Sequence, residues 1–430
     1  MEYKKLFPTI IYYCLLACCF VTPLLVSVTS SELFEFPKML FIYSMALVIA
    51  ASWMLHTIIT GKLIWKRSWL DIPLLLILIT QFISTIYSIH PYTSWFGYYS
   101  RFHGGMVSTI CYIIIAWAFI RFSKKSWVKQ MFLASLASVS LVCLFAIAEH
   151  FGIDANMWVQ DVQNRVFSTL GQPNWLAAWL IALLPVSLLW SIKPPKTIWS
   201  ILLAGNMLIT TISYLITYAF TQNPLPFYGN NLLILLTMFI ILNSVFISQI
   251  KQLRTLLSLI EKFLYPLLSA MMVLSILFTK SRSGILGLLA TLVIFFISFY
   301  LYQQSRAKFN QPSVYKPALL LVLIMVLIGL VGTEWTPNFA QMVGSNSKKV
   351  KNPLAQTATV KPLPYAESVS ESTDIRQVVW QGAVAVWKQY PLFGSGTETF
   401  AYAYYPVRPR AHNNLSEWDF LYNKAHNEYL

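Results

Sequence analysis

Charged side chains are scarce in this chain. Only 11% of its 430 residues are Asp, Glu, Lys or Arg, while 57% are hydrophobic and the mean hydropathy is +0.60. A soluble domain normally carries about 25% charged residues. The composition therefore excludes an ordinary soluble protein and predicts a chain that lies largely in lipid.

Cysteines and metal-binding motifs are also scarce. The chain has five cysteines, and all of them fall within long apolar runs, at Cys14, Cys18, Cys19, Cys111 and Cys143. Such cysteines are typical of packing faces between membrane helices. The sequence has no CxxC pair with metal spacing and no HExxH, GxSxG or Walker-type motif. We expect no disulfide outside the membrane, no bound metal and no cofactor.

Apolar runs near 20 residues long recur along the sequence, and this is the length that crosses a hydrocarbon core as a helix. Backbone polar groups in lipid must be bonded within the segment, so each run is expected to be helical. The sequence therefore predicts an all-α integral membrane protein, a polytopic bundle of about eleven transmembrane helices with one long extracytoplasmic segment. The expected spans are 8–28, 38–59, 70–89, 104–122, 127–149, 174–191, 198–220, 230–249, 263–279, 284–302 and 317–333.

The basic residues are distributed unevenly between the connections. If the N-terminus is cytoplasmic, the inside connections hold 17 of the 31 Lys and Arg residues, Arg121 among them, and the outside connections between spans hold five. This asymmetry follows the positive-inside rule. It predicts a multi-pass protein of the cytoplasmic (inner) membrane with residues 334–430 on the extracytoplasmic side. The net charge of +15 is thereby explained without nucleic acid as a partner.

The sequence divides into three parts. Residues 1–333 form the multi-span bundle, and residues 334–373 are rich in Ser, Thr, Pro, Lys and Asn, which predicts a flexible extracytoplasmic linker. Residues 374–430 regain helical spacing from Asp374 to Pro391, with an apolar stripe that includes Ile375, Val379 and Trp387. The chain then ends in a segment that contains a His-Asn pair.

Two extracytoplasmic turns carry cations beside the start of a span. Arg165 precedes a Gly-Gln-Pro-Asn turn in which Asn174 is expected to cap the next helix, and Lys280 and Arg282 lie in a very short turn between two spans. An arginine beside a helix N-terminus suits an anion, and a guanidinium binds phosphate oxygens in pairs. Contact with lipid headgroups is the alternative explanation for these cations.

Two further candidates lie in the C-terminal part. Arg376 is on the predicted extracytoplasmic helix, where a surface salt bridge is the simpler explanation, and His426 stands in the run Ala425-His426-Asn427-Glu428. A histidine titrates near neutral pH and can act as a base. A structural role is the alternative for a single histidine.

Four motifs occur in one order along the chain. They are WFGYYSRFHGG, which contains Arg101, RVFSTLGQPNWLA, SRSG between two spans, and DIRxxxW followed by PLFGSG and HNEYL. Together these motifs resemble the O-antigen ligase and polymerase superfamily of membrane glycosyltransferases. The resemblance covers residues from about 95 to the end of the sequence.

The resemblance implies a metal-independent enzyme. Such an enzyme moves a glycan from undecaprenyl-pyrophosphate to an acceptor hydroxyl on a glycan, a lipid or a protein, at the outer face of the cytoplasmic membrane. By matched motif, Arg165, Arg282 and Arg376 are expected to bind the donor pyrophosphate, and His426 is expected to activate the acceptor. The expected supporting residues are Asn174, Lys280, Arg101, Asn427 and Glu428.

One feature departs from the family pattern, and several functions stay open. In the family further spans follow the His-Asn motif, whereas this sequence stops at Leu430, so we expect the chain to be incomplete. A repeat-unit polymerase and a protein O-oligosaccharyltransferase share the same motifs. A membrane transporter is an alternative of another class, although the spans carry few of the mid-membrane charges that transporters use.

Overall fold

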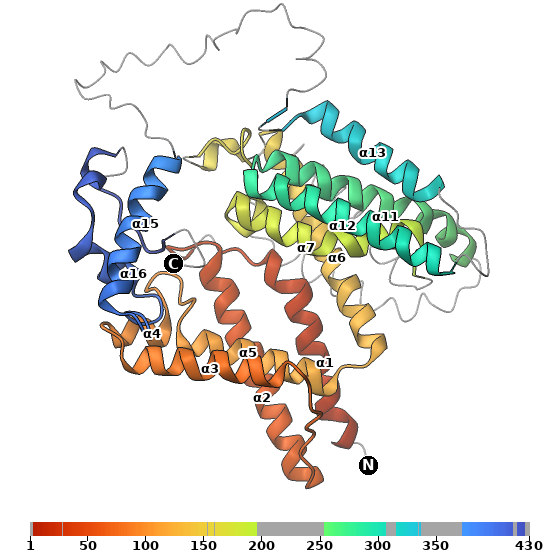
Figure 1. Ribbon diagram of the computed structural model, residues 1–430. Helices are drawn as coiled ribbons and strands as arrows, with labels where there is room; N and C mark the ends of the chain where they lie inside the picture. Colours follow the sequence, from red (N-terminus) through yellow and green to blue (C-terminus); the bar gives the residue numbers. More distant parts are fainter. Residues whose placement is uncertain are drawn as a thin grey trace, which may run out of the picture. The chain divides into compact units, whose positions relative to one another are not determined.

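The computed structural model describes residues 3–27, 29–152, 154–158, 160–195, 253–306, 315–333, 335–336, 372–415 and 419–425. Within these ranges every regular element is an α-helix or a 3-10 helix (Figure 1). The predicted all-α fold class is therefore confirmed. The expected spans 198–220 and 230–249, almost all of the linker 334–373, and residues 426–430 lie outside the described residues.

Nine of the described helices coincide with expected spans. Five are long and apolar enough to cross a membrane: Lys5–Leu24, Glu35–Thr60, Lys125–His150, Pro173–Ile192 and Arg282–Ser305. Four are shorter apolar helices: Asp71–Ile86, Met106–Phe122, Phe263–Phe278 and Lys316–Val331. The total of eleven spans stays a prediction, because two of them lie outside the described part of the chain.

The chain forms two compact units, and each is built from separate stretches of sequence. The first unit contains Met1–Ile11, Met39–Phe122 and Ser347–Leu430. The second unit contains Tyr12–Lys38 and Ser123–Asn346. The C-terminal segment therefore belongs to the same unit as residues near the N-terminus.

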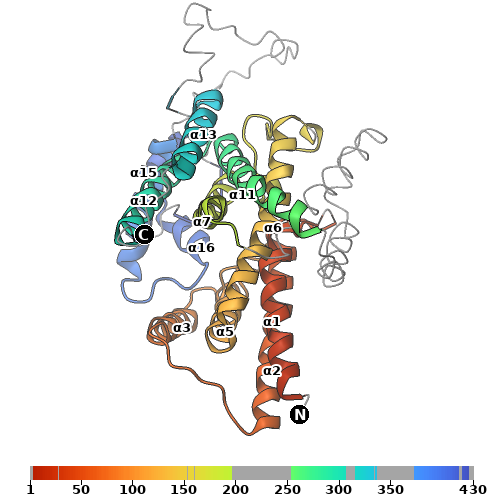
Figure 2. The ribbon, with the colours of Figure 1, turned by 90° about the vertical axis from the view of Figure 1, so that its right-hand side faces the viewer.

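The second unit is a helical bundle. Its helices are α6 (Lys125–His150), α7 (Pro173–Ile192), α11 (Leu253–Phe278), α12 (Arg282–Arg306) and α13 (Tyr315–Val331), and Figures 1 and 2 show them gathered into one group. Leu180, Tyr265 and Met272 are fully buried in its core. Helices α7 and α12 pack closely because glycine faces α7: a Cβ added at Gly284 would lie 2.7 Å from Ala177 Cβ. Small residues commonly allow membrane helices to approach in this way.

The first unit contains α2 (Glu35–Thr60, from Met39 onward), α3 (Asp71–Ile86), the short α4 (Pro91–Phe96) and α5 (Met106–Phe122). Helices α3 and α5 contact each other. They run antiparallel, as the bond between Arg121 near the end of α5 and Asp71 at the start of α3 shows. Arg121 was expected at the cytoplasmic side, which stays a prediction, and the structure places it in the last turn of α5. Its side chain is fully buried, and the Asp71 carboxylate pairs with its charge at 2.5 Å.

The C-terminal part of the first unit begins with α15 (Ser372–Gln389), followed by α16 (Phe400–Tyr404). The apolar stripe of α15 buries Ile375, Val379, Ala383 and Val386. All of these except Ala383 pack with Tyr404 and Tyr422 in a small core. Trp387 was expected on the same stripe, but 57% of it is exposed. The helix ends before Pro391, as the sequence predicts, because proline cannot continue the hydrogen-bond ladder.

Candidate functional site

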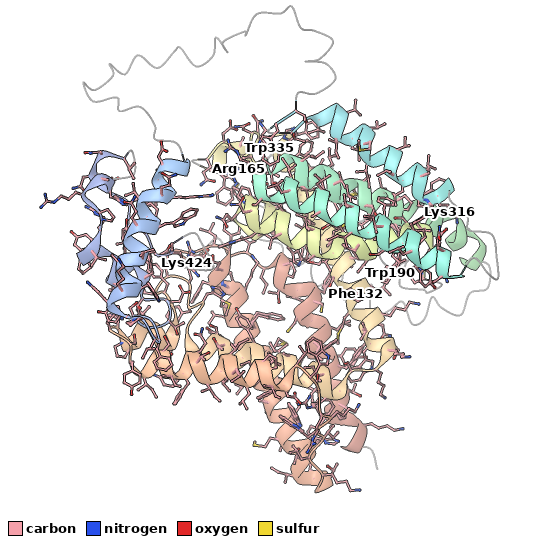
Figure 3. The ribbon with its side chains drawn as sticks, viewed as in Figure 1. Phe132, Arg165, Trp190, Lys316, Trp335 and Lys424 are labelled. Atoms are coloured by element: carbon pink, nitrogen blue, oxygen red, sulfur yellow. The ribbon has the colours of Figure 1, made fainter. Side chains whose placement is uncertain are left out.

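Two connections of the second unit meet beside Arg165 (Figure 3). The Nε of Arg165 donates to the backbone oxygen of Thr279 at 3.1 Å, and an outer guanidinium nitrogen donates to Oδ1 of Asn174 at 3.2 Å. The hydroxyl of Ser281 donates to the same Asn174 oxygen at 2.7 Å. The structure thus brings Arg165 and Asn174 to the turn that precedes Arg282, more than 100 residues away in sequence.

Asn174 has a different role from the one expected. Helix α7 begins at Pro173, its N-cap position is Gln172, and no side chain caps it. Asn174 lies inside the first turn, so the expectation that it caps the helix is wrong. Its carboxamide oxygen instead accepts from Arg165 and Ser281, and the side chain joins the two connections.

A buried carboxylate holds the loop that carries Arg165. Oε2 of Glu149 accepts from the backbone N–H groups of Phe167 and Ser168 at 3.0 and 2.8 Å, and none of Glu149 is exposed. The backbone N–H of Val166 donates to Phe278 at 3.2 Å. Sequence reasoning missed Glu149. The available signal was an acid in the last turn of an otherwise apolar span, where the helix macrodipole disfavours negative charge.

The start of α12 completes this cluster. The hydroxyl of Ser281 accepts from the backbone N–H of Gly284 at 3.1 Å and so caps the helix. Arg282 is the first residue of α12 and is exposed. Lys280 is also exposed, and its Nζ donates to Asn164. Two helix N-termini and three cations therefore lie at these bonded turns, and such a combination stabilises an anion of the phosphate type.

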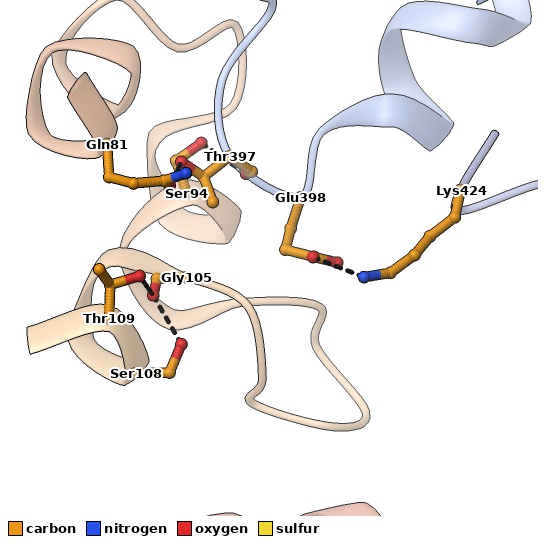
Figure 4. Close-up of polar contacts among 8 residues, drawn as sticks. All are labelled: Gln81, Ser94, Gly105, Ser108, Thr109, Thr397, Glu398 and Lys424. Carbon is orange, nitrogen blue, oxygen red and sulfur yellow. Dashed lines mark hydrogen bonds and ion pairs between the residues drawn. The ribbon is translucent and has the colours of Figure 1, made fainter. Parts of the chain in front are cut away.

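In the first unit, the connection between α3 and α5 is bonded to the C-terminal segment (Figure 4). The hydroxyl of Thr397 donates to Gln81 Oε1, and the Ser94 hydroxyl donates to the backbone oxygen of Thr397, each at 2.9 Å. The backbone N–H of Ile89 donates to Ser395 at 2.9 Å. The glycine turn that follows α15 is thus held by residues about 300 positions earlier.

Three glycines of the WFGYYSRFHGG motif allow this loop to fold closely. Gly97 has a φ of 87°, and a Cβ added there would lie 2.2 Å from the backbone oxygen of His103. A Cβ on Gly104 would lie 2.2 Å from Oε1 of Glu398, and one on Gly105 would lie 2.4 Å from the Gly97 nitrogen. No side chain fits between these groups.

Replacing Gly97 by alanine is expected to destabilise the folded protein by at least about 3 kcal/mol, because a left-handed backbone and a clash with backbone atoms add together. Gly394 is the matched control, since it has a φ of 70° and open space around the added Cβ. Alanine at Gly394 should cost only the backbone strain, about 1–2 kcal/mol. Denaturant unfolding in detergent measures both variants, and equal losses would contradict the close contact in the loop.

Charged groups gather where this loop meets the C-terminal segment. Nζ of Lys424 lies 2.9 Å from Oε1 of Glu398, which itself has a φ of 58° (Figure 4). Burial lowers the pKa of His103, and the nearby charges of Lys424 and Arg101 lower it further, while Glu398 opposes them. Both effects favour the neutral form of the His103 imidazole. Neither His103 nor Glu398 was singled out from the sequence, because only the fold brings them together.

Helix α15 holds the chain immediately before His426. The indole N–H of Trp380 donates to the backbone oxygen of Ala425 at 3.0 Å, and Ala425 is buried. Arg376 is exposed one helical turn before Trp380, on the same side of the helix. His426, Asn427 and Glu428 lie outside the described residues. Their roles stay predictions, but the chain reaches them from a fixed point on α15.

His412 is the described histidine nearest to the end of the chain, and it lies inside a small aromatic core. It is fully buried, its Nδ1 lies 2.9 Å from the Tyr404 hydroxyl, and its ring contacts Tyr422 edge to face. These contacts make it part of the small core beneath α15. A structural role explains its position.

The described helices and their composition define a multi-pass membrane protein. Residues 267–430 match the family model described as O-Antigen ligase. The match confirms, for these residues, the resemblance on which the sequence analysis relied. It includes Lys280, Arg282, Arg376 and His426, whereas Arg165 and Asn174 precede it. No curated protein and no solved structure matches the chain.

Proposed function

We propose that this protein transfers a glycan from an undecaprenyl-pyrophosphate donor to an acceptor hydroxyl at the outer face of the cytoplasmic membrane. The observation that carries the proposal is the bonded cluster of Arg165, Asn174 and Ser281 beside the N-termini of α7 and α12. It offers preorganised donors to a phosphate group. A ligase, a repeat-unit polymerase and a protein O-oligosaccharyltransferase would all use such a cluster for the donor. The proposal therefore does not specify which molecule carries the acceptor hydroxyl.

The proposed step is a displacement at the anomeric carbon of the glycan. The acceptor oxygen forms the new bond to this carbon while the bond to the phosphate oxygen breaks, and the pyrophosphate keeps the electron pair. Arg165 and Arg282 are proposed to stabilise the charge that develops on the leaving group, which is where preorganised donors lower a barrier most. His426 is proposed to take the proton of the acceptor hydroxyl. Arg376, Lys280 and Arg101 are proposed to add positive potential for the donor.

Deletion of the gene in its own host tests the proposal whatever the sugar is. Cells without the protein should accumulate a glycan on undecaprenyl-pyrophosphate and lose a surface glycan, and the full-length gene should restore both. Mass spectrometry of extracted lipids measures the accumulation. Unchanged lipid-linked glycans would contradict transfer, and solute uptake by proteoliposomes that contain the purified protein would favour a transporter.

Thiol labelling tests the proposed orientation. In a background without the five native cysteines, Asn414→Cys and Lys66→Cys place single thiols at exposed positions of the first unit. An impermeant maleimide should label Asn414→Cys in right-side-out vesicles and should label Lys66→Cys only after the membrane is opened. The opposite pattern would place the C-terminal segment in the cytoplasm and would exclude transfer at the outer face.

A further inference from the structure

A second polar cluster lies in the first unit, at the opposite end of α3 and α5 from the glycine loop. It combines Trp53 and His56 of α2, Trp65 of the connection before α3, and Trp117 and Arg121 of α5. Arg121 is 1% exposed and His56 is 6% exposed. With 17 residues in α5, the two ends are separated by about 25 Å at 1.5 Å per residue. The cluster is therefore remote from the C-terminal segment.

The rings of the cluster surround the arginine. The guanidinium carbon of Arg121 lies 4.2 Å from the centre of the Trp65 ring. The Trp65 ring in turn lies 6.1 Å from that of Trp53 and 5.5 Å from that of Trp117. On the other side Phe122 contacts both Trp53 and His56 edge to face. These contacts shield the guanidinium from solvent.

The buried nitrogens of this cluster have few partners. Only one guanidinium nitrogen of Arg121 is bonded, to Asp71. In the described part of the chain no hydrogen-bond partner is found for five buried side-chain nitrogens: Nε and the other outer nitrogen of Arg121, Nε1 of Trp53, Nε1 of Trp117 and Nδ1 of His56. A buried donor without a partner is costly, and native proteins rarely gather several in one place unless something accepts from them.

The chemistry of the donors defines what they would accept. Indole and guanidinium N–H groups donate and never accept, so the partner must offer several acceptor atoms. Asp71 supplies one such group and uses only one edge of the guanidinium. Lys62, Lys66 and Arg67 are exposed in the same connection as Trp65 and add positive charge. Oxygens of a phosphate group satisfy both the donors and the charge.

We propose that this cluster binds a phosphate-type oxyanion, at a site separate from the candidate donor site. Trp65 is expected to control access, because 46% of the residue is exposed while the guanidinium that its ring covers is buried. The oxyanion is either the headgroup of an anionic lipid or free phosphate, since both present the same oxygens.

Native mass spectrometry of the purified, delipidated full chain tests the proposal with three probes: phosphatidylglycerol, phosphatidylcholine of the same acyl chains, and inorganic phosphate. Wild-type protein should retain phosphatidylglycerol or phosphate and should not retain phosphatidylcholine. Retention of phosphatidylglycerol alone identifies the headgroup of a lipid as the source. Retention of inorganic phosphate identifies a free anion.

Two substitutions with opposite expected effects locate the site. Trp117→Phe removes one N–H donor and should weaken binding roughly tenfold, the usual loss for a hydrogen bond to a charged group. Asp71→Asn removes the competing carboxylate and should strengthen binding. Trp69→Phe is the control, because Trp69 lies in the same connection and is 82% exposed. If neither probe binds, or if both substitutions leave binding unchanged, the proposal is overturned. This readout does not depend on glycan transfer.

Discussion

Replacing Arg165 by lysine is expected to slow glycan transfer about a hundredfold, although the positive charge is kept. The arginine side chain bonds Thr279 and Asn174 through two different nitrogens and still has N–H groups for a phosphate. Lysine is a point charge on a flexible stem and cannot maintain this fork. Its single ammonium group can bond Thr279 and Asn174 or reach the donor phosphate, but it cannot do both at once.

A transfer assay in membranes from the deletion host, with variant and wild-type protein at equal abundance, measures this effect. Arg67→Lys is the matched control, since Arg67 is exposed and is not among the residues proposed to act on the donor or the acceptor. Asn174→Ala should also lower the rate, because it removes the acceptor that orients Arg165. An Arg165→Lys variant with more than about a third of wild-type turnover would contradict a geometric role, since loss of one preorganised donor costs about 10²–10³-fold.

Replacing His426 by alanine is expected to lower the rate of transfer about 10²–10⁴-fold, the range for loss of general-base assistance. Donor retention should hardly change, because the proposed pyrophosphate residues are untouched. Added imidazole should restore part of the activity of His426→Ala, which a purely structural role would not allow. Chelators should have no effect on the wild-type protein.

A variant His426→Ala that keeps more than about a tenth of the wild-type rate would show that the acceptor is activated in another way, given the size of general-base effects. His103 is then the next candidate, because its lowered pKa favours the neutral imidazole that a base requires. The rate of transfer by a variant in which both histidines are replaced tests this. A further loss of rate would show that His103 substitutes as the base, and an unchanged rate would show that it does not.

The helices could be predicted from the sequence because the cost of burying backbone polar groups in lipid depends on local composition alone. The helix Met106–Phe122 coincides with the expected span 104–122 within two residues. The ion pair between Arg121 and Asp71 could not be predicted, because Asp71 is 50 residues earlier. A charge count along the sequence carries no information about such a pair.

The candidate site was predicted less completely than the fold. The cations at Arg165, Lys280 and Arg282 could be recognised because each stands next to an apolar run. Glu149, His103 and Glu398 could not, because each acts through partners that are distant in sequence, such as Ser168 for Glu149 and Lys424 for Glu398. The capping role predicted for Asn174 was wrong because α7 begins one residue earlier, at Pro173, and the Asn174 side-chain oxygen accepts from Arg165 and Ser281 instead.

The discontinuous first unit has a consequence for the order in which the protein is assembled during synthesis. Residues 123–346 of the second unit leave the ribosome as one continuous stretch, whereas α3, α4 and α5 are made early and must wait for the C-terminal segment. Until that segment arrives, Gln81, Ser94 and the backbone of Ile89 lack the Thr397 and Ser395 groups that bond them. The glycine loop therefore reaches its final, bonded structure only after residues 395–397 have been translated, some 300 residues after the loop itself.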